Sequence, residues 1–466
     1  MIFSSLEFLC VFLPVVFLLY SVIPSLKARN GLLILASLFF YAYGEPVYVF
    51  LMIFSALFNY LCARVISRGR GRKAALIAGV SINLGILAVF KYAVFLIESC
   101  NRMLSTSLPV PQIALPIGIS FFTFQALSYV IDVYMERVEV QKSFWKVLLY
   151  ISFFPQLIAG PIVKYRDINE AIDNRSQDAQ QIAAGLSRFI CGLGKKVLIA
   201  NTMGLAADHV FTASMSQINA VTAWIGAAAY LMQIYYDFSG YSDMAIGLGK
   251  MFGFQFKENF IYPYAAESIK EFWRRWHISL STWFKEYLYI PLGGNRKGRF
   301  RTCVNKIIVF FFTGLWHGAN WTFVVWGLYH GLFLLLEEYV PVIKRLPKFI
   351  AHIYTVLVVC VGFVIFRADT LTQGLSMIEQ MFTGFTFSTA SVSFAMQQLT
   401  PWFIVMFLAA VVGAGPIRTL ADKIRRQAEK GNGLRRGVFV VTILILCWCL
   451  IRLSGSTYNP FIYFRF

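Results

Sequence analysis

Long apolar runs recur along the whole chain, and they limit its possible folds more than any other feature. Of the 466 residues, 58% are hydrophobic and only 14% are charged. Such proportions are typical of proteins that cross a membrane many times and fall outside the range of soluble globular domains. No stretch between the runs is long enough to fold alone. We therefore predict one integral-membrane domain, residues 1–466, of the all-α polytopic class.

The apolar runs divide the chain into about eleven to thirteen membrane-embedded segments. The first, residues 5–23, follows no basic segment and precedes no small-residue cleavage site, so we expect a retained helix rather than a signal peptide. Further helices are expected at 31–43, 47–66, 74–96, 118–134, 182–200, 218–248, 352–366, 401–412 and 438–450. The run at 147–163 contains Pro155, Gly160 and Pro161 and predicts a broken helix, which must be buried in protein or line a cavity.

The net charge of +19 is concentrated in short connectors between apolar runs. Lys27 and Arg29 form one such connector, and residues 67–73 form the next. Basic connectors mark the cytoplasmic side of a membrane, so the N-terminus is expected on the extracytoplasmic side. The charge therefore indicates orientation and contact with anionic lipid head groups, and it does not indicate a nucleic-acid partner.

Residues 305–331, an aromatic and apolar stretch, contain two histidines, His317 and His330. A helix that begins near Asn305 would place His317 about 18 Å into a hydrocarbon layer about 30 Å thick. An ionisable side chain at that depth is costly, so a functional role is the default hypothesis. Helix packing is the alternative explanation for both histidines, because each lies in a G-x-x-x-G repeat, at 314–318 and 327–331.

The residues around the two histidines favour different roles for them. His317 has Thr313, Trp316 and Asn320 nearby in sequence, and a neutral imidazole with an ordinary pKa near 6.5 could act as a general base toward a hydroxyl. His330 lacks such polar neighbours, so we interpret it as structural support.

Residues 271–288 are expected to form one amphipathic helix at the membrane interface. His277 lies on its apolar stripe, while Arg274 and Arg275 lie off it. The alternative to a functional role is a simple membrane anchor. The stripe comprises Trp273, Trp276, His277, Leu280, Trp283, Phe284 and Tyr287. Basic residues at 270–275 and 296–301 would suit a polyanionic cytosolic donor, such as acetyl-coenzyme A or another acyl thioester.

Polar residues inside the apolar run at 218–248 are further candidates. Asp237 and Asp243 could form a proton or cation relay, but we favour packing partners for buried lysine or arginine. The tentative donor-binding or substrate-binding residues are Trp273, Arg274, Arg275, Trp316, Asn320, Gln125, Gln233, Tyr236, Asp237 and Ser239. The histidines and cysteines show no metal-ligand spacing, so we predict no metal site and no tightly bound cofactor.

Six longer motifs are spread over nearly the whole chain. They are LPIGISFFTFQALSYVIDVY (115–134), FPQLIAGPIVKY (154–165), QIYYDFSGYSDMAIGLGKMFGF (233–254), FWRRWHISLSTWFKEYLYIPLGGNR (272–296), GLWHGANWTFVVWGLYHG (314–331) and NPFIYFRF (459–466). Together they resemble the membrane-bound O-acyltransferase family, and within it the bacterial branch that acetylates alginate. D-alanyl transfer proteins resemble the chain more distantly.

The resemblance implies a ring of membrane helices with re-entrant segments around a central tunnel. It implies that His317 is the catalytic histidine and that His277 lines the tunnel. It further implies an acetyl group passed from a cytosolic donor, across a bacterial plasma (inner) membrane, to an exopolysaccharide or an extracytoplasmic partner acyltransferase. A transporter without covalent chemistry, or a non-catalytic membrane subunit, remains open as an alternative.

Overall fold

The computed structural model describes residues 1–415 and 432–462. Most of a further basic connector, residues 418–436, lies outside this part, and so do the last four residues of the C-terminal motif. The described residues are helices joined by turns and contain no β-strand. They form two compact units, one of Met1–Phe189 with Asp243–Lys257, the other of Ile190–Ser242 with the residues from Glu258 onward. The single-domain assignment stays a prediction.

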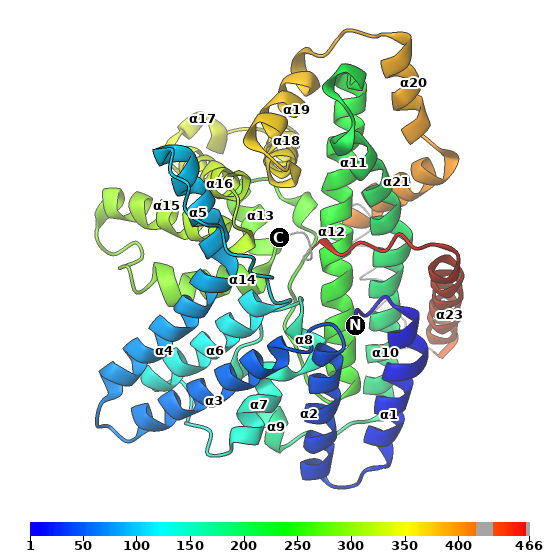
Figure 1. Ribbon diagram of the computed structural model, residues 1–466. Coiled ribbons are helices and arrows are strands. Elements are labelled where there is room, and N and C mark those ends of the chain that lie inside the picture. Colours follow the sequence, from blue (N-terminus) through cyan, green and yellow to red (C-terminus); the bar gives the residue numbers. More distant parts are fainter. Residues whose placement is uncertain (416–431, 463–466) are drawn as a thin grey trace. The chain divides into compact units, whose positions relative to one another are not determined.

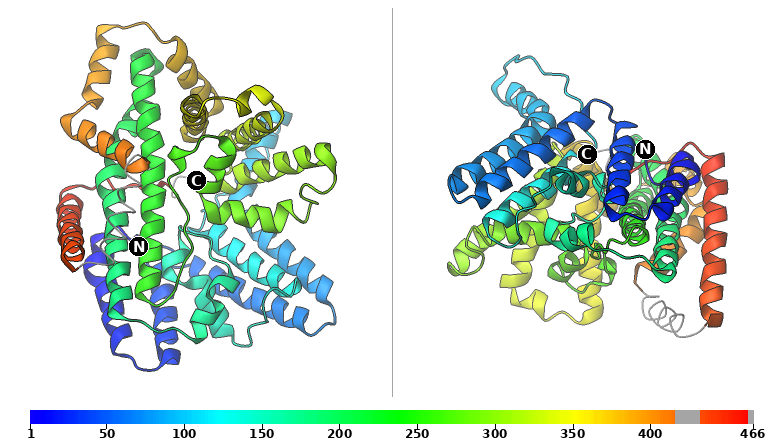
Figure 2. Two further views of the ribbon diagram at one scale, coloured as in Figure 1. Left: turned by 180° about the vertical axis from the view of Figure 1, so that it is seen from behind. Right: turned by 90° about the horizontal axis from the view of Figure 1, so that it is seen from below.

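The first unit contains most of the N-terminal helices (Figure 1). They are α1 (Leu13–Val22), α2 (Leu26–Ala42), α3 (Tyr48–Ser67), α4 (Arg72–Leu87), α5 (Ala93–Leu104), α6 (Ile119–Tyr134), α7 (Phe144–Ser152), α8 (Phe154–Leu157) and α9 (Tyr165–Asp173). The π-helical segment η1 (Phe8–Phe12) precedes α1 directly, and η2 (Ala88–Tyr92) joins α4 to α5. Helices α3, α4 and α6 pack on one another, and they lie side by side in Figure 1 and in Figure 2.

Two helices contribute to both units: α10 (Ala179–Gly194) and α12 (Ala220–Met251). The second unit then adds α11 (Asn201–Thr212), α13 (Ile269–Arg275), α14 (Ile278–Phe284), α15 (Gly298–His317), α16 (Trp321–Tyr339), α17 (Pro341–Lys344), α18 (Lys348–Arg367), α19 (Leu371–Thr383), α20 (Thr389–Gln398), α21 (Pro401–Ala414) and α23 (Asn432–Gly455). Its short π or 3-10 segments are η3 (Lys195–Ala200), η4 (Met215–Gln217), η5 (Pro263–Ala265) and η6 (Lys285–Tyr289).

Four helical stretches in the described part of the chain are long and apolar enough to cross a membrane. They are Tyr48–Ser67, Arg72–Leu104, Lys348–Arg367 and Arg436–Gly455. A fifth span results if α20 and α21, which meet at 63°, count as one. The chain is thus a multi-pass α-helical membrane protein. The larger number of embedded segments, which includes shorter and interrupted helices, stays a prediction, and so does the tunnel.

The broken helix expected at 147–163 is present in the first unit. Helix α7 ends at Ser152, α8 covers one turn, and residues 158–164 have no regular structure although all of them are buried. The hydroxyl of Tyr150 donates a hydrogen bond to the carbonyl of Val163 at 3.0 Å. Protein atoms therefore surround this irregular backbone and pair part of it, as an apolar environment requires.

Two expected helices have different boundaries in the second unit. The helix expected to begin near Asn305 begins at Gly298 and ends at His317, so its expected start was wrong, while the depth of His317 in the membrane stays a prediction. The single helix expected at 271–288 was also wrong, because α13 ends at Arg275 and α14 begins at Ile278. Both differences change how the histidines are presented.

Candidate active site

Helices α15 and α16 form a tight hairpin that fixes the position of His317. The glycines of the two G-x-x-x-G repeats face each other, since a Cβ atom on Gly327 would lie 3.1 Å from the Cα of Gly314. A Cβ on Gly314 would also collide with the carbonyl oxygen of Phe323. The packing role expected for the repeats is therefore confirmed, and it brings His317, the last residue of α15, against the first turns of α16.

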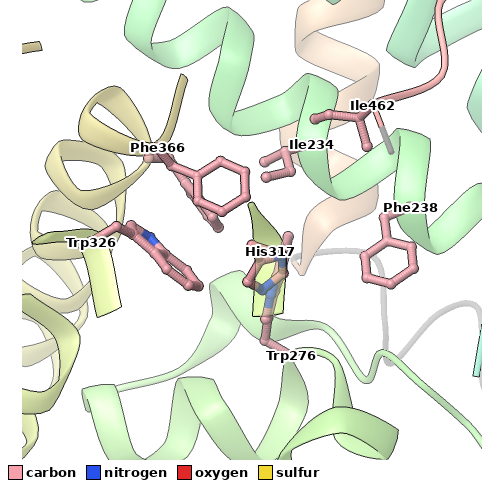
Figure 3. A pocket seen from close by; sticks show the side chains of 8 residues that line it. Ile234, Phe238, Trp276, His317, Trp326, Phe366 and Ile462 are labelled. Atoms are coloured by element: carbon pink, nitrogen blue, oxygen red, sulfur yellow. The ribbon is translucent and has the colours of Figure 1, made fainter. Parts of the chain in front are cut away.

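His317 lies at a small apolar cavity within the second unit (Figure 3). Its side chain is 6% exposed. The imidazole is in edge-on ring contact with Trp326 at 5.1 Å and Phe366 at 5.2 Å between centroids. The cavity holds about 10 Å³, room for roughly one water molecule. Its lining comprises Ile234, Phe238, Trp276, His317, Trp326, Phe363, Phe366 and Ile462.

His277 occupies the break between α13 and α14. Its φ of 44° places it in the left-handed region, which is rare for a residue with a side chain. Backbone bonds from outside the helices hold this break: Ile261 N–H donates to the carbonyl of Arg275 at 3.0 Å, and Ile278 N–H donates to that of Asn259 at 2.9 Å. The tertiary structure, rather than helical periodicity, therefore determines the direction of this imidazole.

The rings of His277 and His317 lie 6.4 Å apart, centroid to centroid. His277 is fully buried and does not itself line the cavity, but its ring is 4.6 Å from that of Phe238, which does. The structure therefore brings together the two histidines singled out in the sequence. Their catalytic roles stay predictions.

Asn259 determines which nitrogen of His277 carries the proton. Its side-chain oxygen accepts hydrogen bonds from the backbone N–H of Ser279 at 3.2 Å and from the Ser279 hydroxyl at 2.9 Å. A backbone N–H can only donate, so the atom facing Nδ1 of His277 at 3.2 Å is an oxygen. Nδ1 must then be the protonated nitrogen, and Nε2 retains its lone pair. In the described residues, Nε2 has no hydrogen-bond partner.

Burial also keeps the His277 imidazole neutral. Desolvation lowers its pKa to about 3, because the charged form would lose its hydration. The residue lies outside the helices that are long enough to cross a membrane. At neutral pH the ring is therefore uncharged, and its Nε2 can accept a hydrogen bond.

His330 lies away from the cavity lining and packs among aromatic rings. Its ring centroid is 5.2 Å from that of Trp273 and 5.1 Å from that of Trp326. Neither ring nitrogen has a hydrogen-bond partner among the described residues. A Cβ on Gly362 of α18 would lie 2.9 Å from Nε2 of His330, so the two helices approach closely here. This environment agrees with structural support.

The other aromatic and polar candidates near the histidines occupy distinct positions. Trp316 is buried with its ring 5.6 Å from that of His277, and Trp273 packs beside Trp326 at 5.7 Å. Asn320 caps α16, because its side-chain oxygen accepts from the N–H of Thr322 at 3.1 Å and its amide donates to the carbonyl of Asp369. In this structure, the side chain of Asn320 therefore stabilises the N-terminus of α16.

The two arginines of α13 differ in their surroundings. Arg274 is exposed, whereas Arg275 is half-buried and pairs with Glu271 at 2.6 Å. All seven residues of the predicted apolar stripe are buried, so the side of this segment that faces the protein was predicted correctly. The helix break does not change this because both short helices keep the same face inward.

Asp237 and Asp243 both pair with basic residues, as expected for packing partners. Within the second unit, Asp237 pairs with Lys196 at 2.6 Å, and both side chains are almost fully buried. Within the first unit, Asp243 pairs with Arg188 at 2.8 Å. The relay hypothesis receives no support from this geometry.

The remaining candidates on α12 are buried. Tyr236 donates its hydroxyl proton to the carbonyl of Ala410 at 2.7 Å. The side-chain oxygen of Gln233 and the hydroxyl of Ser239 have no hydrogen-bond partner among the described residues. Gln125 belongs to the first unit, where it is fully buried, and neither side-chain amide atom is bonded to a described residue. Their assignment to substrate binding stays a prediction.

Sequence reasoning missed several residues of this site: the cavity-lining Ile234, Phe238, Trp326, Phe363, Phe366 and Ile462, and Asn259, which bonds His277. Asn259 lies in a polar connector 18 residues before His277, and no spacing rule links them. Ile462 lines the cavity although it lies far from His317 in the sequence. Its only signal was its place in the C-terminal motif quoted above.

Comparison with known proteins gives the family. The model of the membrane-bound O-acyltransferase (MBOAT) family matches residues 135–368. A probable alginate O-acetylase of Pseudomonas putida is 39% identical over the full length of both chains. A peptidoglycan O-acetyltransferase of Helicobacter pylori is 37% identical over 82% of this chain and 80% of its own. A teichoic acid D-alanyltransferase of Bacillus subtilis is 28% identical over 54% of this chain and 68% of its own.

The range of the family model includes His277 and His317, and the similarity to the Pseudomonas putida relative covers the whole chain. The all-helical fold and the apolar spans agree with them. The chain belongs to the membrane-bound O-acyltransferase family.

Proposed function

We propose that this chain is an O-acetyltransferase of the bacterial plasma (inner) membrane that acts on a polysaccharide. An acetyl thioester on the cytosolic side, acetyl-coenzyme A or an acylated carrier, is the donor. The acceptor is a hydroxyl of an alginate-like exopolysaccharide or of an extracytoplasmic partner acyltransferase. The names of the most similar relatives support this substrate class. The N-terminus is on the extracytoplasmic side.

The observation that carries the proposal is the buried pair of imidazoles, with His317 at the cavity and His277 held in one tautomer by Asn259. His317 is at the cavity, where a neutral imidazole can act as general base toward a hydroxyl. His277 is neutral with Nε2 as its acceptor, which suits it to hold a donor rather than to take a proton.

In the proposed reaction, the imidazole of His317 accepts the proton of the acceptor hydroxyl as its oxygen attacks the thioester carbonyl. The carbon–oxygen bond forms, the carbon–sulfur bond breaks, and the proton passes from His317 to the departing thiolate. His277 positions the donor, because its Nε2 lone pair can accept a hydrogen bond from an amide N–H of the thioester arm. The aromatic walls exclude water, which would otherwise compete as acceptor.

The test uses the purified full-length protein in lipid vesicles with radiolabelled acetyl-coenzyme A and, in parallel, acetyl-phosphopantetheine. We expect thiol release and acetyl transfer that depend on His317. Phosphopantetheine is a suitable probe because coenzyme A and acylated carrier proteins share this arm. Its phosphate is negatively charged, as the basic residues near α13 and α15 would require of a donor.

The same vesicles test the transporter alternative. A transporter would accumulate label inside the vesicles without releasing thiol, and that result would reject the proposed function. Thiol release that is unchanged in a His317→Ala protein would remove His317 from the mechanism.

A further inference from the structure

The segment after α23 returns to the cavity at His317 and is bound along its length. It appears in red in Figure 1, where it runs from α23 across α12. The hydroxyl of Tyr458 donates to Asp208 at 2.6 Å, and the amide of Asn201 donates to the side-chain oxygen of Asn459 at 3.2 Å. We call residues 456–462 the return segment.

A buried ion pair holds the end of the return segment. Lys196 Nζ donates to the carbonyl of Pro460, and the N–H of Ile462 donates to Asp237 at 2.8 Å. The same lysine and aspartate pair with each other at 2.6 Å. Hydrogen bonds to charged groups are stronger than neutral ones, and a buried pair is tolerated when its remaining bonding capacity is satisfied. The return segment provides these bonds, so its backbone is fixed at this point.

The side chain of Ile462 is 6% exposed and forms one wall of the cavity. In Figure 3, Ile462 and Ile234 lie on the same side of His317, while Trp326 and Phe366 lie on another. The cavity holds only about 10 Å³, room for roughly one water molecule, so a larger group beside His317 would need space that lining side chains such as Ile462 occupy. Neighbouring Phe461 points elsewhere and packs on Tyr241, ring to ring, at 4.7 Å.

We infer that Ile462, fixed by the Lys196–Asp237 pair, limits the acyl group that can reach His317 to acetyl. The inference rests on the proposed acyltransferase function and adds to it a residue that determines donor specificity. Removing side-chain volume at 462 should admit longer acyl groups without changing the imidazoles. The chemistry of the step is unchanged, since only the alkyl part of the acyl group differs.

The experiment compares acetyl-, propionyl- and butyryl-phosphopantetheine as donors for the full-length protein in vesicles, with released thiol as the readout. The wild type should prefer acetyl. Ile462→Ala should raise the butyryl-to-acetyl rate ratio about 10-fold to 200-fold, the range in which hydrophobic pockets discriminate single methylene differences. Ile462→Val should raise it less, and Ile462→Phe should slow all three donors.

Phe461→Leu is the matched control, because it changes the adjacent side chain of the return segment outside the cavity and should keep the wild-type ratio. An active wild type whose ratio is unchanged in both Ile462→Ala and Ile462→Val would overturn the inference and leave the proposed function intact. If Ile462→Ala fails to fold, Ile462→Val decides alone. A wild type without His317-dependent thiol release would instead reject the proposed function, and the size limit with it.

Discussion

Asn259 and His277 face each other across 3.2 Å, side-chain oxygen against Nδ1, in a region from which water is excluded. This contact determines which of the two ring nitrogens of His277 carries the proton. Because Nδ1 carries the proton, Nε2 is the ring nitrogen that keeps its lone pair and can act as an acceptor.

Replacing Asn259 by aspartate should make activity depend on pH in a new way. Burial lowers the pKa of His277 to about 3, so the wild-type ring is neutral at pH 7. A carboxylate beside Nδ1 favours the charged imidazole and raises this pKa. We expect activity to be lost at acidic pH, below the raised pKa, where the ring is charged, and to recover as pH rises through that pKa. The measurement is the pH profile of thiol release.

Asn259→Ala serves as the control for this profile, because it removes the oxygen without adding charge. The activity of Asn259→Ala should fall, but its pH profile should show no additional loss at acidic pH. Superimposable profiles for wild type and Asn259→Asp would show that this contact does not control the His277 proton.

Replacing His317 by alanine should abolish transfer while leaving the protein inserted and folded. Loss of a general base costs about 10²-fold to 10⁴-fold in rate. His330→Gln is the comparison, since His330 does not line the cavity, and it should reduce stability more than turnover. Thiol release and the melting temperature in detergent, measured on the same preparations, distinguish the two effects. If His317→Ala and His330→Gln lost turnover equally, the assignment of a catalytic role to His317 and a structural role to His330 would be contradicted.

Adding a methyl group between α15 and α16 should destabilise the protein. A Cβ on Gly327 would collide with the carbonyl oxygen of Phe310, and backbone atoms cannot move aside as side chains can. Overpacking of this kind costs about 1–3 kcal/mol. We expect Gly327→Ala to lower the thermal stability and to displace His317. Gly85→Ala is the control, because a Cβ at Gly85 of α4 meets nothing within 4 Å; equal melting temperatures for the two variants would argue against a tight hairpin.

Breaking the Lys196–Asp237 pair should cost more than breaking a surface pair. Removing one partner of a buried pair typically costs about 3–5 kcal/mol, because the other charge stays buried. Lys196→Met should therefore be strongly destabilised, and Lys196→Met with Asp237→Asn should recover part of the loss. Lys257→Met, which breaks an exposed pair with Asp167, should cost under about 1 kcal/mol. A double variant no more stable than Lys196→Met would contradict a dominant charge effect. Thermal unfolding in detergent measures all three.

For residues 271–288, the sequence pattern predicted correctly which side chains are buried but did not predict where the helix breaks. Every residue on the apolar stripe of 271–288 is buried, because apolar periodicity reports which side faces the protein. The break at His277 could not be predicted this way, since it depends on backbone bonds from Asn259 and Ile261, residues that periodicity does not connect to it.

The two site histidines were predicted from cost and context, whereas their supporting residues were not. His317 was singled out as an ionisable side chain in an apolar stretch and His277 by its place on the apolar stripe of 271–288, and the family resemblance then assigned both to the site. Asn259 and Ile462 are ordinary residues in their own segments. They join the site only because a connector and the return segment meet α12 and α14, a tertiary arrangement that sequence spacing does not encode.

The position of Ile462 after α23 has a consequence for biogenesis. A membrane protein is inserted as it is synthesised, and its N-terminal parts fold first. Both histidines are therefore synthesised well before Ile462, which lines the cavity at His317. Until the return segment binds Lys196 and Asp237, this cavity lacks one of its walls. The cavity is thus completed only after α23 has been made.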